Sequence, residues 1–420
     1  MALNAKIGQK VRGGGGLAKT LRRAIGGNAP IEFAAYDGSR AGPPDAPVRV
    51  EVVRPEALSY LASASGELGL ARAYVTGSLE VVGDVYTALA GMADQEIGWV
   101  QRLPLLPVLG LHRVRHRVAP PSQETRLRGR KHSKARDREA ISHHYDVSNQ
   151  FYEWLLGPSM TYTCAVYPRA DASLEEAQYT KHDVVARKLG LQPGMRLLDV
   201  GCGWGGMVMH AAREYGVRAL GVTLSQRQAE WAQRAIIDAG LSDRAEVRHL
   251  DYRDVPEDRF DAISSIGLTE HIGSANLRSY VTFLHSRLRP GGRLLNHCIT
   301  RRDNHQRPQV GAFMDRYVFP DGELEGPGFI FSLIHDNGFE VRHEENFREH
   351  YALTLTAWSR NLDAHWEQAV AEVGEERARV WRLYIAASRL AFERNNIQLH
   401  QILAVKLDGT ASHMPLRPDW

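Results

Sequence analysis

The chain has 420 residues, of which 43% are hydrophobic and 24% charged, and its formal net charge is +3. At roughly 150 residues per domain, this length predicts a globular protein of two or three domains. The three cysteines, Cys164, Cys202 and Cys298, exclude a disulfide framework and lack the Cys-x-x-Cys spacing of a zinc site, so a reducing compartment is expected.

Residues 1–95 predict a small N-terminal domain. Its early lysines and arginines come with no apolar stretch before a cleavage site, which indicates a cytoplasmic protein. Alternation from Val48 to Val53 predicts a strand, and the spacing from Glu56 to Ala64 predicts a helix. No catalytic constellation is visible in this region.

Residues 96–139 predict a basic linker. The apolar run from Leu103 to Leu111 is interrupted by prolines and is far shorter than the ~20 residues that span a bilayer. The basic residues that follow include Arg126, Arg128, Arg130, Lys131, Lys134 and Arg136. Such a stretch suits the surface of an anionic membrane, and a solvated linker explains it equally well. Nucleic acid is not the expected partner, because no aromatic residues interleave with the basic ones.

From residue 140 to residue 420, predicted strands alternate with helices. The strands are Arg196 to Val200, Arg218 to Val222, Ala245 to Leu250, Phe260 to Ile266 and Arg293 to His297, and Gln226 to Ala239 is an intervening helix. This alternation predicts an α/β fold with a doubly wound parallel sheet that binds its ligand at the carboxyl ends of the strands. The segment from Leu362 to Val405 is expected to be mostly helical and to form a lid.

The glycine-rich segment at 197–206, Leu-Leu-Asp-Val-Gly-Cys-Gly-Trp-Gly-Gly, is the most informative motif. Glycines after an apolar strand let the backbone approach a ligand, and the helix that follows offers unpaired N–H groups. A dinucleotide site would place an acid at the end of the second strand. Here that strand ends in Thr223-Leu224-Ser225, with Gln228 behind it.

Together with Asp199 and Asp251-Tyr252, this departure resembles an S-adenosylmethionine (SAM) methyltransferase. Seven further motifs, in matching order over residues 140–406, resemble the cyclopropane-fatty-acyl-phospholipid synthase family. They are His-His-Tyr-Asp-Val-Ser-Asn at 143–149, Tyr-Thr-Cys-Ala at 162–165, Gly-Val-Thr-Leu-Ser-x-x-Gln at 221–228, Glu-His-Ile-Gly at 270–273, Arg-Tyr-Val-Phe-Pro at 316–320, the stretch 351–358, and Asn-Ile-Gln-Leu at 396–399.

The resemblance implies a Rossmann-like class I methyltransferase with a helical lid and a smaller N-terminal domain that presents lipid or mediates dimerisation. The residues it implies for SAM binding are Tyr145, Tyr162, Thr163, Asp199, Gly201, Gly203, Trp204, Thr223, Leu224, Ser225, Gln228, Asp251 and Tyr252. It also implies a peripheral position at the inner face of the membrane and a homo-oligomer.

The implied reaction adds a methyl carbon from SAM to the cis double bond of an unsaturated acyl chain in a phospholipid. The resulting carbocation is deprotonated by a bound bicarbonate ion. The implied bicarbonate ligands are Cys164, Glu270, His297, the backbone of Ile299, and Tyr351, while Tyr317 and Phe319 are candidates for the wall of the cation pocket.

Several of these residues have simpler interpretations. A lone buried cysteine such as Cys164 usually behaves as a small hydrophobe, and Tyr317 and Phe319 fit an ordinary core equally well. His271 invites a metal site, but no cysteine or histidine stands at ligand spacing around it, so no metal is expected.

The sequence leaves the product open between a cyclopropane and a 10-methylene chain. Gly267-Leu268-Thr269 before Glu270, and Val166-Tyr167 after Cys-Ala, depart from many members that make cyclopropanes. A methylene product would be the precursor of a 10-methyl fatty acid and would need a flavoprotein reductase as partner. The alternative is a mycolic-acid-type methyltransferase that acts on carrier-bound chains; a non-catalytic lipid-binding protein is disfavoured because all five bicarbonate positions are present.

Overall fold

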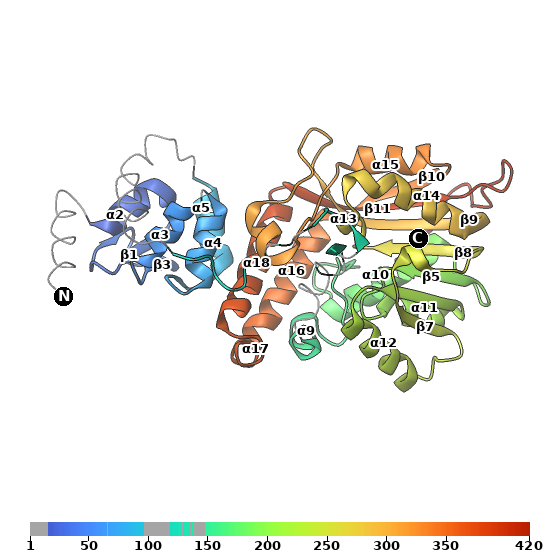
Figure 1. The fold of residues 1–420 in the computed structure, drawn as a ribbon, viewed down its shortest axis with the longest axis horizontal. Helices are drawn as coiled ribbons and strands as arrows, with labels where there is room; N and C mark the ends of the chain where they lie inside the picture. Colours follow the sequence, from blue (N-terminus) through green and yellow to red (C-terminus); the bar gives the residue numbers. More distant parts are fainter. Residues whose placement is uncertain are drawn as a thin grey trace. The chain divides into compact units, whose positions relative to one another are not determined.

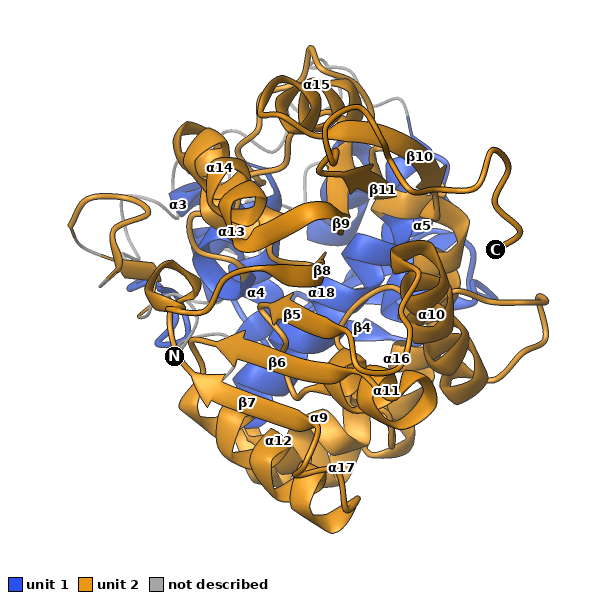
Figure 2. Cartoon of the chain, turned by 90° about the vertical axis from the view of Figure 1, so that its right-hand side faces the viewer, with its two compact units in different colours: residues 1–126, 311–318, 374–390 blue, residues 127–310, 319–373, 391–420 orange. Residues whose placement is uncertain are grey.

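The structure, a computed structural model, describes residues 16–64, 66–95, 118–125, 127, 129–134, 136–137, 139 and 148–420. The chain forms two compact units (Figure 2). The first comprises residues 1–126, 311–318 and 374–390, and the second comprises residues 127–310, 319–373 and 391–420. Local sequence patterns do not predict that residues 311–318 and 374–390 belong to the same unit as the N-terminal residues.

The first unit, whose N-terminal helices and strands are blue in Figure 1, contains a four-stranded sheet in the order β2-β1-β3-β4. Its strands are β1 (Ile31–Ala35), β2 (Arg40–Ala41), β3 (Val48–Val52) and β4 (Leu79–Val82), and its helices include α2 (Leu17–Leu21), α3 (Glu56–Ser63), α4 (Glu67–Val75) and α5 (Val85–Ala93). Every second residue of β3 is buried, as expected for a strand with one face on a core. The predicted strand and helix of this region are therefore confirmed.

The second unit contains a seven-stranded sheet in the order β10-β11-β9-β8-β5-β6-β7. Its strands are β5 (Arg196–Val200), β6 (Arg218–Thr223), β7 (Ala245–His249), β8 (Phe260–Ile266), β9 (Leu288–Arg301), β10 (Glu340–Asn346) and β11 (Ile397–Val405). The strands from β9 to β7 pair in parallel, and β10 and β11 add an antiparallel edge. The predicted α/β class with a doubly wound sheet is confirmed.

Helices cover both faces of this sheet, as Figure 2 shows. The core on one face includes residues of α10 (Leu174–Leu189), α11 (Gly206–Tyr215) and α12 (Gln226–Asp238), and the core on the other includes residues of α14 (Leu277–Arg287) and α15 (Pro327–Asp336). The remaining helices are α9 (Asn149–Leu156), α13 (Thr269–Ile272), α16 (Arg348–Ala364), α17 (Trp366–Val373) and α18 (Glu375–Glu393), whose residues up to 390 belong to the first unit.

Two predicted boundaries were wrong. The segment from Leu362 to Val405 is mostly helical as predicted, but the helical part ends at Glu393 and the last nine residues form β11. Residues 399–405 are buried on both faces, so they show no strand alternation that would separate them from a buried helix. Likewise, β9 (Leu288–Arg301) begins five residues before the predicted strand Arg293 to His297 and ends four residues after it.

Candidate active site

A pocket opens at the carboxyl ends of β5, β6 and β8 in the second unit. Ten of the predicted cofactor residues line it: Tyr162, Thr163, Asp199, Gly201, Gly203, Trp204, Thr223, Leu224, Gln228 and Tyr252. Parallel α/β sheets bind ligands at this edge because each strand there is followed by a loop and the N-terminus of a helix. The pocket therefore lies where the glycine-rich motif placed it.

The glycine loop is shaped to leave room in this pocket. Gly201 and Gly203 have φ angles of 76° and 54°, which L-residues with side chains rarely adopt. A Cβ atom at Gly201 would approach the Leu268 side chain to 3.1 Å, whereas a Cβ at Gly203 would meet no atom within 4 Å. Gly203 therefore presents bare backbone to open space in the pocket.

Three predicted cofactor residues are not part of the described pocket wall. Ser225 is fully buried, and its hydroxyl accepts a hydrogen bond from Gln228 N at 3.3 Å as the N-cap of α12. The carboxylate of Asp251 forms an ion pair with Arg253, whose Nε and Nη2 donate to it at 2.8 and 2.6 Å. Tyr145, with the neighbouring pair His143-His144, lies outside the described residues.

Sequence reasoning missed a polar face of α10 that borders the pocket. Lys181 is buried, and its Nζ contacts Thr163 Oγ1 and His182 Nε2, each at 3.0 Å. Gln178 donates to the carbonyl of Thr163 at 2.9 Å. Polar residues at positions i, i+3 and i+4 lie on one helix face, and this spacing was the signal that could have found them.

Burial perturbs the ionisation of this cluster. It lowers the pKa of Lys181 to about 7, although the negative charge of Asp199 opposes the change. It raises the pKa of Asp199 to about 6, against the hydrogen bond that Ser264 Oγ donates at 2.6 Å. Shifted pKa values of this kind cluster at functional sites.

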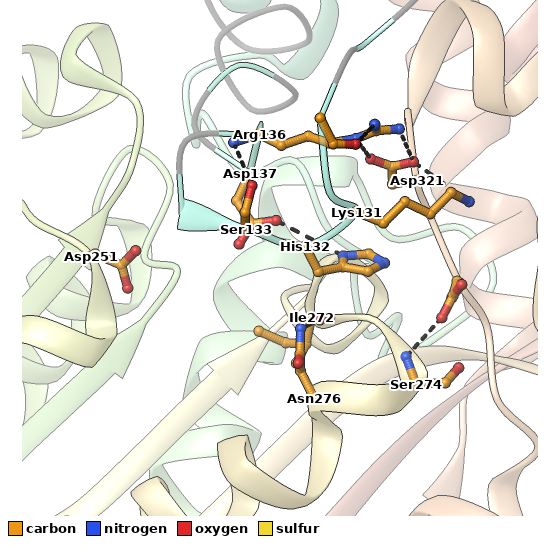
Figure 3. A network of polar contacts seen from close by, with 12 residues as sticks. Lys131, His132, Ser133, Arg136, Asp137, Asp251, Ile272, Ser274, Asn276 and Asp321 are labelled. Carbon is orange, nitrogen blue, oxygen red and sulfur yellow. Dashed lines mark hydrogen bonds and ion pairs between the residues drawn. The ribbon is translucent and has the colours of Figure 1, made fainter.

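Part of the predicted basic linker forms a strap, residues 129–134 and 136–137, beside the pocket (Figure 3). Arg136 donates two hydrogen bonds to the Asp321 carboxylate, from Nε and from Nη2, the latter at 2.8 Å. Lys134 Nζ lies 2.6 Å from Asp254 Oδ1. Lys131 also lies 3.6 Å from the Asp321 carboxylate. These three basic side chains are ion-paired within the second unit, whereas Arg126 and Arg128 lie outside the described residues, as does the run 103–111.

The strap also contributes His132 and Asp137 to the pocket wall, and sequence reasoning missed both. The His132 ring lies against Gly273, where a Cβ atom would come within 2.3 Å of it. The glycine of the Glu-His-Ile-Gly motif therefore makes room for the strap. On the other side, Arg253 binds Asp137 at 3.1 Å.

Glu270 and His297 each present an unpartnered polar atom. Glu270 Oε1 accepts a hydrogen bond from Ile299 N at 2.7 Å. Its Oε2 and the Nε2 of His297 are both buried, with no hydrogen-bond partner among the described residues. Buried polar atoms are normally satisfied, so each of these two atoms has hydrogen-bonding capacity left for a small polar ligand. Ile299 N–H holds the Glu270 carboxylate in this structure, and would have to leave it to bind an anion directly.

The local electrostatics favour neutral groups here. Burial raises the pKa of Glu270 to about 7, although the Ile299 N–H opposes the shift. Burial, with the charges of Lys181 and Lys188, holds the pKa of His297 well below its ordinary value. Burial also raises the pKa of Cys164, which is therefore a thiol and not a thiolate nucleophile.

Backbone contacts connect Cys164 and Tyr351 to this pair. The Cys164 sulfur lies 3.8 Å from the carbonyl of Phe347, which also accepts from Tyr351 N at 3.1 Å. Phe347 N in turn donates to the carbonyl of Leu399 in β11, and Leu399 is the strand partner of Ile299 in β9. These contacts join the elements that carry Cys164, Tyr351 and Ile299, and His297 lies two residues before Ile299 on β9.

A run of aromatic rings leads from the glycine loop to Tyr351. Successive ring centroids are 4.7, 5.9, 5.2 and 6.1 Å apart along Trp204, Tyr152, Tyr162, Trp358 and Tyr351. Trp358 is fully buried. Sequence reasoning singled out Tyr351 and Trp204 but gave no role to Tyr152 or Trp358.

The two predicted cation-pocket residues belong to different units. Tyr317 is in the first unit, where its hydroxyl donates to Glu124 Oε2 at 3.4 Å. Phe319 is in the second unit and packs its ring against His271, with centroids 5.5 Å apart. Neither is among the residues that line the described pocket.

Across the described residues, no helix is both long and apolar enough to cross a membrane. The same part of the chain contains no cluster of three or more histidine, cysteine or acidic residues suited to a metal ion.

Comparison with known proteins identifies the family. The sequence profile of mycolic acid cyclopropane synthetase matches residues 132–402. A probable fatty acid methyltransferase of Mycobacterium tuberculosis, Rv3720, is 57% identical over 94% of this chain and 95% of its own length. A probable fatty acid methyltransferase of Pseudomonas putida is 40% identical over 91% of this chain and 94% of its own.

Solved structures agree. The cyclopropane synthase MmaA2 of Mycobacterium tuberculosis superposes with a TM-score of 0.61 at 32% identity, over 64% of this chain and 98% of that one. The mycolic acid cyclopropane synthase CmaA1, complexed with SAH and CTAB, gives a TM-score of 0.60 at 32% identity with the same coverage. The family resemblance drawn from the motifs is confirmed: the chain is a SAM-dependent methyltransferase that belongs to the mycolic acid cyclopropane synthetase family.

Proposed function

We propose that this enzyme transfers a methyl carbon from SAM to the cis double bond of an unsaturated fatty acyl chain in a phospholipid, with bicarbonate as the base. The observation that carries the proposal is that two buried atoms, Glu270 Oε2 and His297 Nε2, have no hydrogen-bond partner within the part of the chain that the structure describes. The two relatives that match most of the chain are probable fatty acid methyltransferases, which supports a fatty acyl substrate.

The pocket suits the cofactor. Gly201 and Gly203 let a ligand lie against the backbone, and Thr223 to Gln228 stand where a ribose-binding acid would be in a dehydrogenase. When bound, SAM supplies an electrophilic methyl group. The chain then has to orient that methyl and keep water away, and the strap with Arg136 on Asp321 helps to cover the pocket.

Glu270 and His297 suit a bicarbonate ion, which would supply the base. Glu270 Oε2 can accept the hydroxyl of bicarbonate when the carboxylate is ionised, and His297 can donate from Nε2 to an oxygen of the anion. Ile299 N–H fixes Oε1 and so aims the other carboxylate oxygen. A buried oxyanion needs such partners, because an unpaired charge in an apolar site is very costly.

Aromatic rings suit the positive charge that develops on the acyl chain. Tyr162, Trp358 and Tyr351 form a continuous wall beside the glycine loop. Cation–π attraction to such rings contributes about 2 kcal/mol when desolvated. Loss of a proton from the new methyl group gives a cyclopropane, whereas a prior hydride shift gives a methylene, which a flavoprotein reductase would then reduce.

Proton NMR of recovered lipid tests the proposal, since the two products have equal mass. The protein is incubated with SAM, bicarbonate and oleoyl phospholipid vesicles, with the same chain on an acyl carrier protein in parallel. Upfield ring protons identify a cyclopropane, and vinylidene protons identify the branched-chain route. Modification of carrier-bound chains alone would overturn the phospholipid assignment, and full activity without bicarbonate would overturn the base.

A further inference from the structure

A buried lysine lies two hydrogen bonds from His297. Lys188 on α10 has no exposed side-chain surface, and its Nζ donates to Glu345 Oε2 at 2.6 Å and to Gln401 Oε1 at 2.8 Å. The same nitrogen lies 5.2 Å from the centre of the Phe347 ring. Burial lowers the pKa of Lys188, and the Glu345 carboxylate opposes that change. A carboxylate, an amide oxygen and an aromatic face together form a site for an ammonium ion.

The ammonium ion fixes the orientation of the Gln401 amide. An ammonium group has donors and no acceptor, so the amide atom that faces Lys188 must be the oxygen. The amide nitrogen then faces the other way, where it lies 3.2 Å from His297 Nδ1. Gln401 is fully buried and pairs directly with His297 across β11 and β9. Competing water therefore has no access that would relax this arrangement.

The amide orientation decides which nitrogen of His297 carries the proton. The low pKa of His297 makes its imidazole neutral, with a single N–H. Because Gln401 donates to Nδ1, that nitrogen must be the acceptor, and the proton resides on Nε2. Nε2 is the atom that is buried without a partner among the described residues.

We propose that Lys188 and Gln401 are positioning residues that hold His297 in the Nε2–H tautomer, so that its donor faces the anion site. The proposal rests on the function proposed above in one respect only, namely that the group bound there is bicarbonate. With the opposite tautomer, His297 would present a lone pair to an anion, and the interaction would change from attraction to repulsion.

The test is histidine-selective ¹⁵N NMR on the full chain, with His297 assigned by its absence in His297→Gln. The wild-type protein is expected to show a neutral ring protonated at Nε2. Gln401→Glu keeps the shape of the side chain but removes the donor, so the ring should become protonated at Nδ1. Lys188→Met leaves the amide free to rotate and should give a mixture of tautomers. An Nδ1–H ring in the wild type, or an unchanged tautomer in Gln401→Glu, would overturn the relay.

A matched control lies on the same strand. Gln398 is half-buried in β11 and lies 2.9 Å from another histidine, His400. Gln398→Glu makes the same chemical change without touching His297, so its His297 signal should match the wild type. A shift in this control as large as that in Gln401→Glu would attribute the effect to general charge and contradict the relay.

Kinetics separates the relay from the proposed function. If bicarbonate is the base, its half-saturating concentration in Gln401→Glu should rise about ten- to a hundredfold, the usual loss of a hydrogen bond to a charged group. The Kd of SAM, measured by calorimetry, should stay within about twofold, whereas general unfolding would weaken both. If wild-type turnover does not depend on bicarbonate concentration but NMR gives the expected tautomers, the proposed base is overturned and the tautomer relay is still supported.

Discussion

Replacing Glu270 with glutamine should stabilise the folded protein in a pH-dependent way. Burial raises the pKa of Glu270 from 4.5 to about 7, so the folded protein keeps a proton that the unfolded chain has already released. The folded state binds more protons between these two pH values, and the free energy of unfolding therefore falls as pH rises through this window. Above about pH 7 the destabilisation is complete, and below 4.5 it is absent.

The magnitude follows from the width of the window. At about 1.4 kcal/mol per pH unit, the shift to about 7 corresponds to at most about 3 kcal/mol. Glutamine cannot ionise, and its Oε1 keeps the acceptor for Ile299 N–H. Any cost of burying its amide nitrogen is the same at every pH. Relative to the wild type, Glu270→Gln should thus gain about 2 to 3 kcal/mol of unfolding free energy between pH 5 and pH 8.

Urea unfolding of both proteins at pH 5 and pH 8 measures this gain. Glu323→Gln is a control at a carboxyl whose pKa is shifted the other way: burial alone would raise the pKa of Glu323, but hydrogen bonding by Ser274, whose N–H donates at 2.7 Å, and nearby positive charge together outweigh burial and lower the pKa. Its carboxylate stabilises the fold above about pH 4.5 and loses that effect only as pH falls below this value, so Glu323→Gln should cost nearly the same at pH 5 and at pH 8. An equal effect of Glu270→Gln at both pH values would refute the buried-charge argument.

Four further predictions concern activity and cofactor binding. Glu270→Gln should abolish methyl transfer while calorimetry shows nearly unchanged SAM affinity; a large loss of SAM binding would contradict its place outside the cofactor loop. Gly203→Val should abolish SAM binding, because at a φ of 54° the new side chain would enter the open space of the cofactor pocket. Unchanged SAM affinity in this variant would show that the glycine loop does not bind the cofactor. Arg136→Met should weaken SAM binding about fivefold, because it breaks both contacts of the strap with Asp321 in an ion pair that is mostly buried; a SAM affinity equal to that of the wild type would remove the strap from cofactor binding. Trp358→Leu should slow single-turnover methyl transfer about thirtyfold through loss of about 2 kcal/mol of cation stabilisation, and a rate equal to that of the wild type would exclude the aromatic wall.

Local patterns in the sequence were sufficient for the sheet and the glycine loop. The strand from Arg196 to Val200 and the helix from Gln226 were predicted to within a residue or two, because apolar periodicity and the Ser225 cap act over a few neighbouring residues. The ligand edge followed as well, since parallel strands bring their carboxyl ends to one side. Local patterns did not predict β11, because a strand that is buried on both faces shows no alternation of apolar and polar residues.

Motifs also named the catalytic candidates, but the sequence did not give the partners that tune them. Glu270 and Ile299 are hydrogen-bonded across 29 positions, and Lys188 and Gln401 across 213. Such contacts depend on strand order and register, which pair Gln401 with His297 only after the antiparallel edge has formed. The sequence by itself determined the fold class, the cofactor loop and the reactive residue types. Only the tertiary structure decided which oxygen of Glu270 and which nitrogen of His297 have no partner among the residues described, because burial and hydrogen bonding are properties of the folded chain.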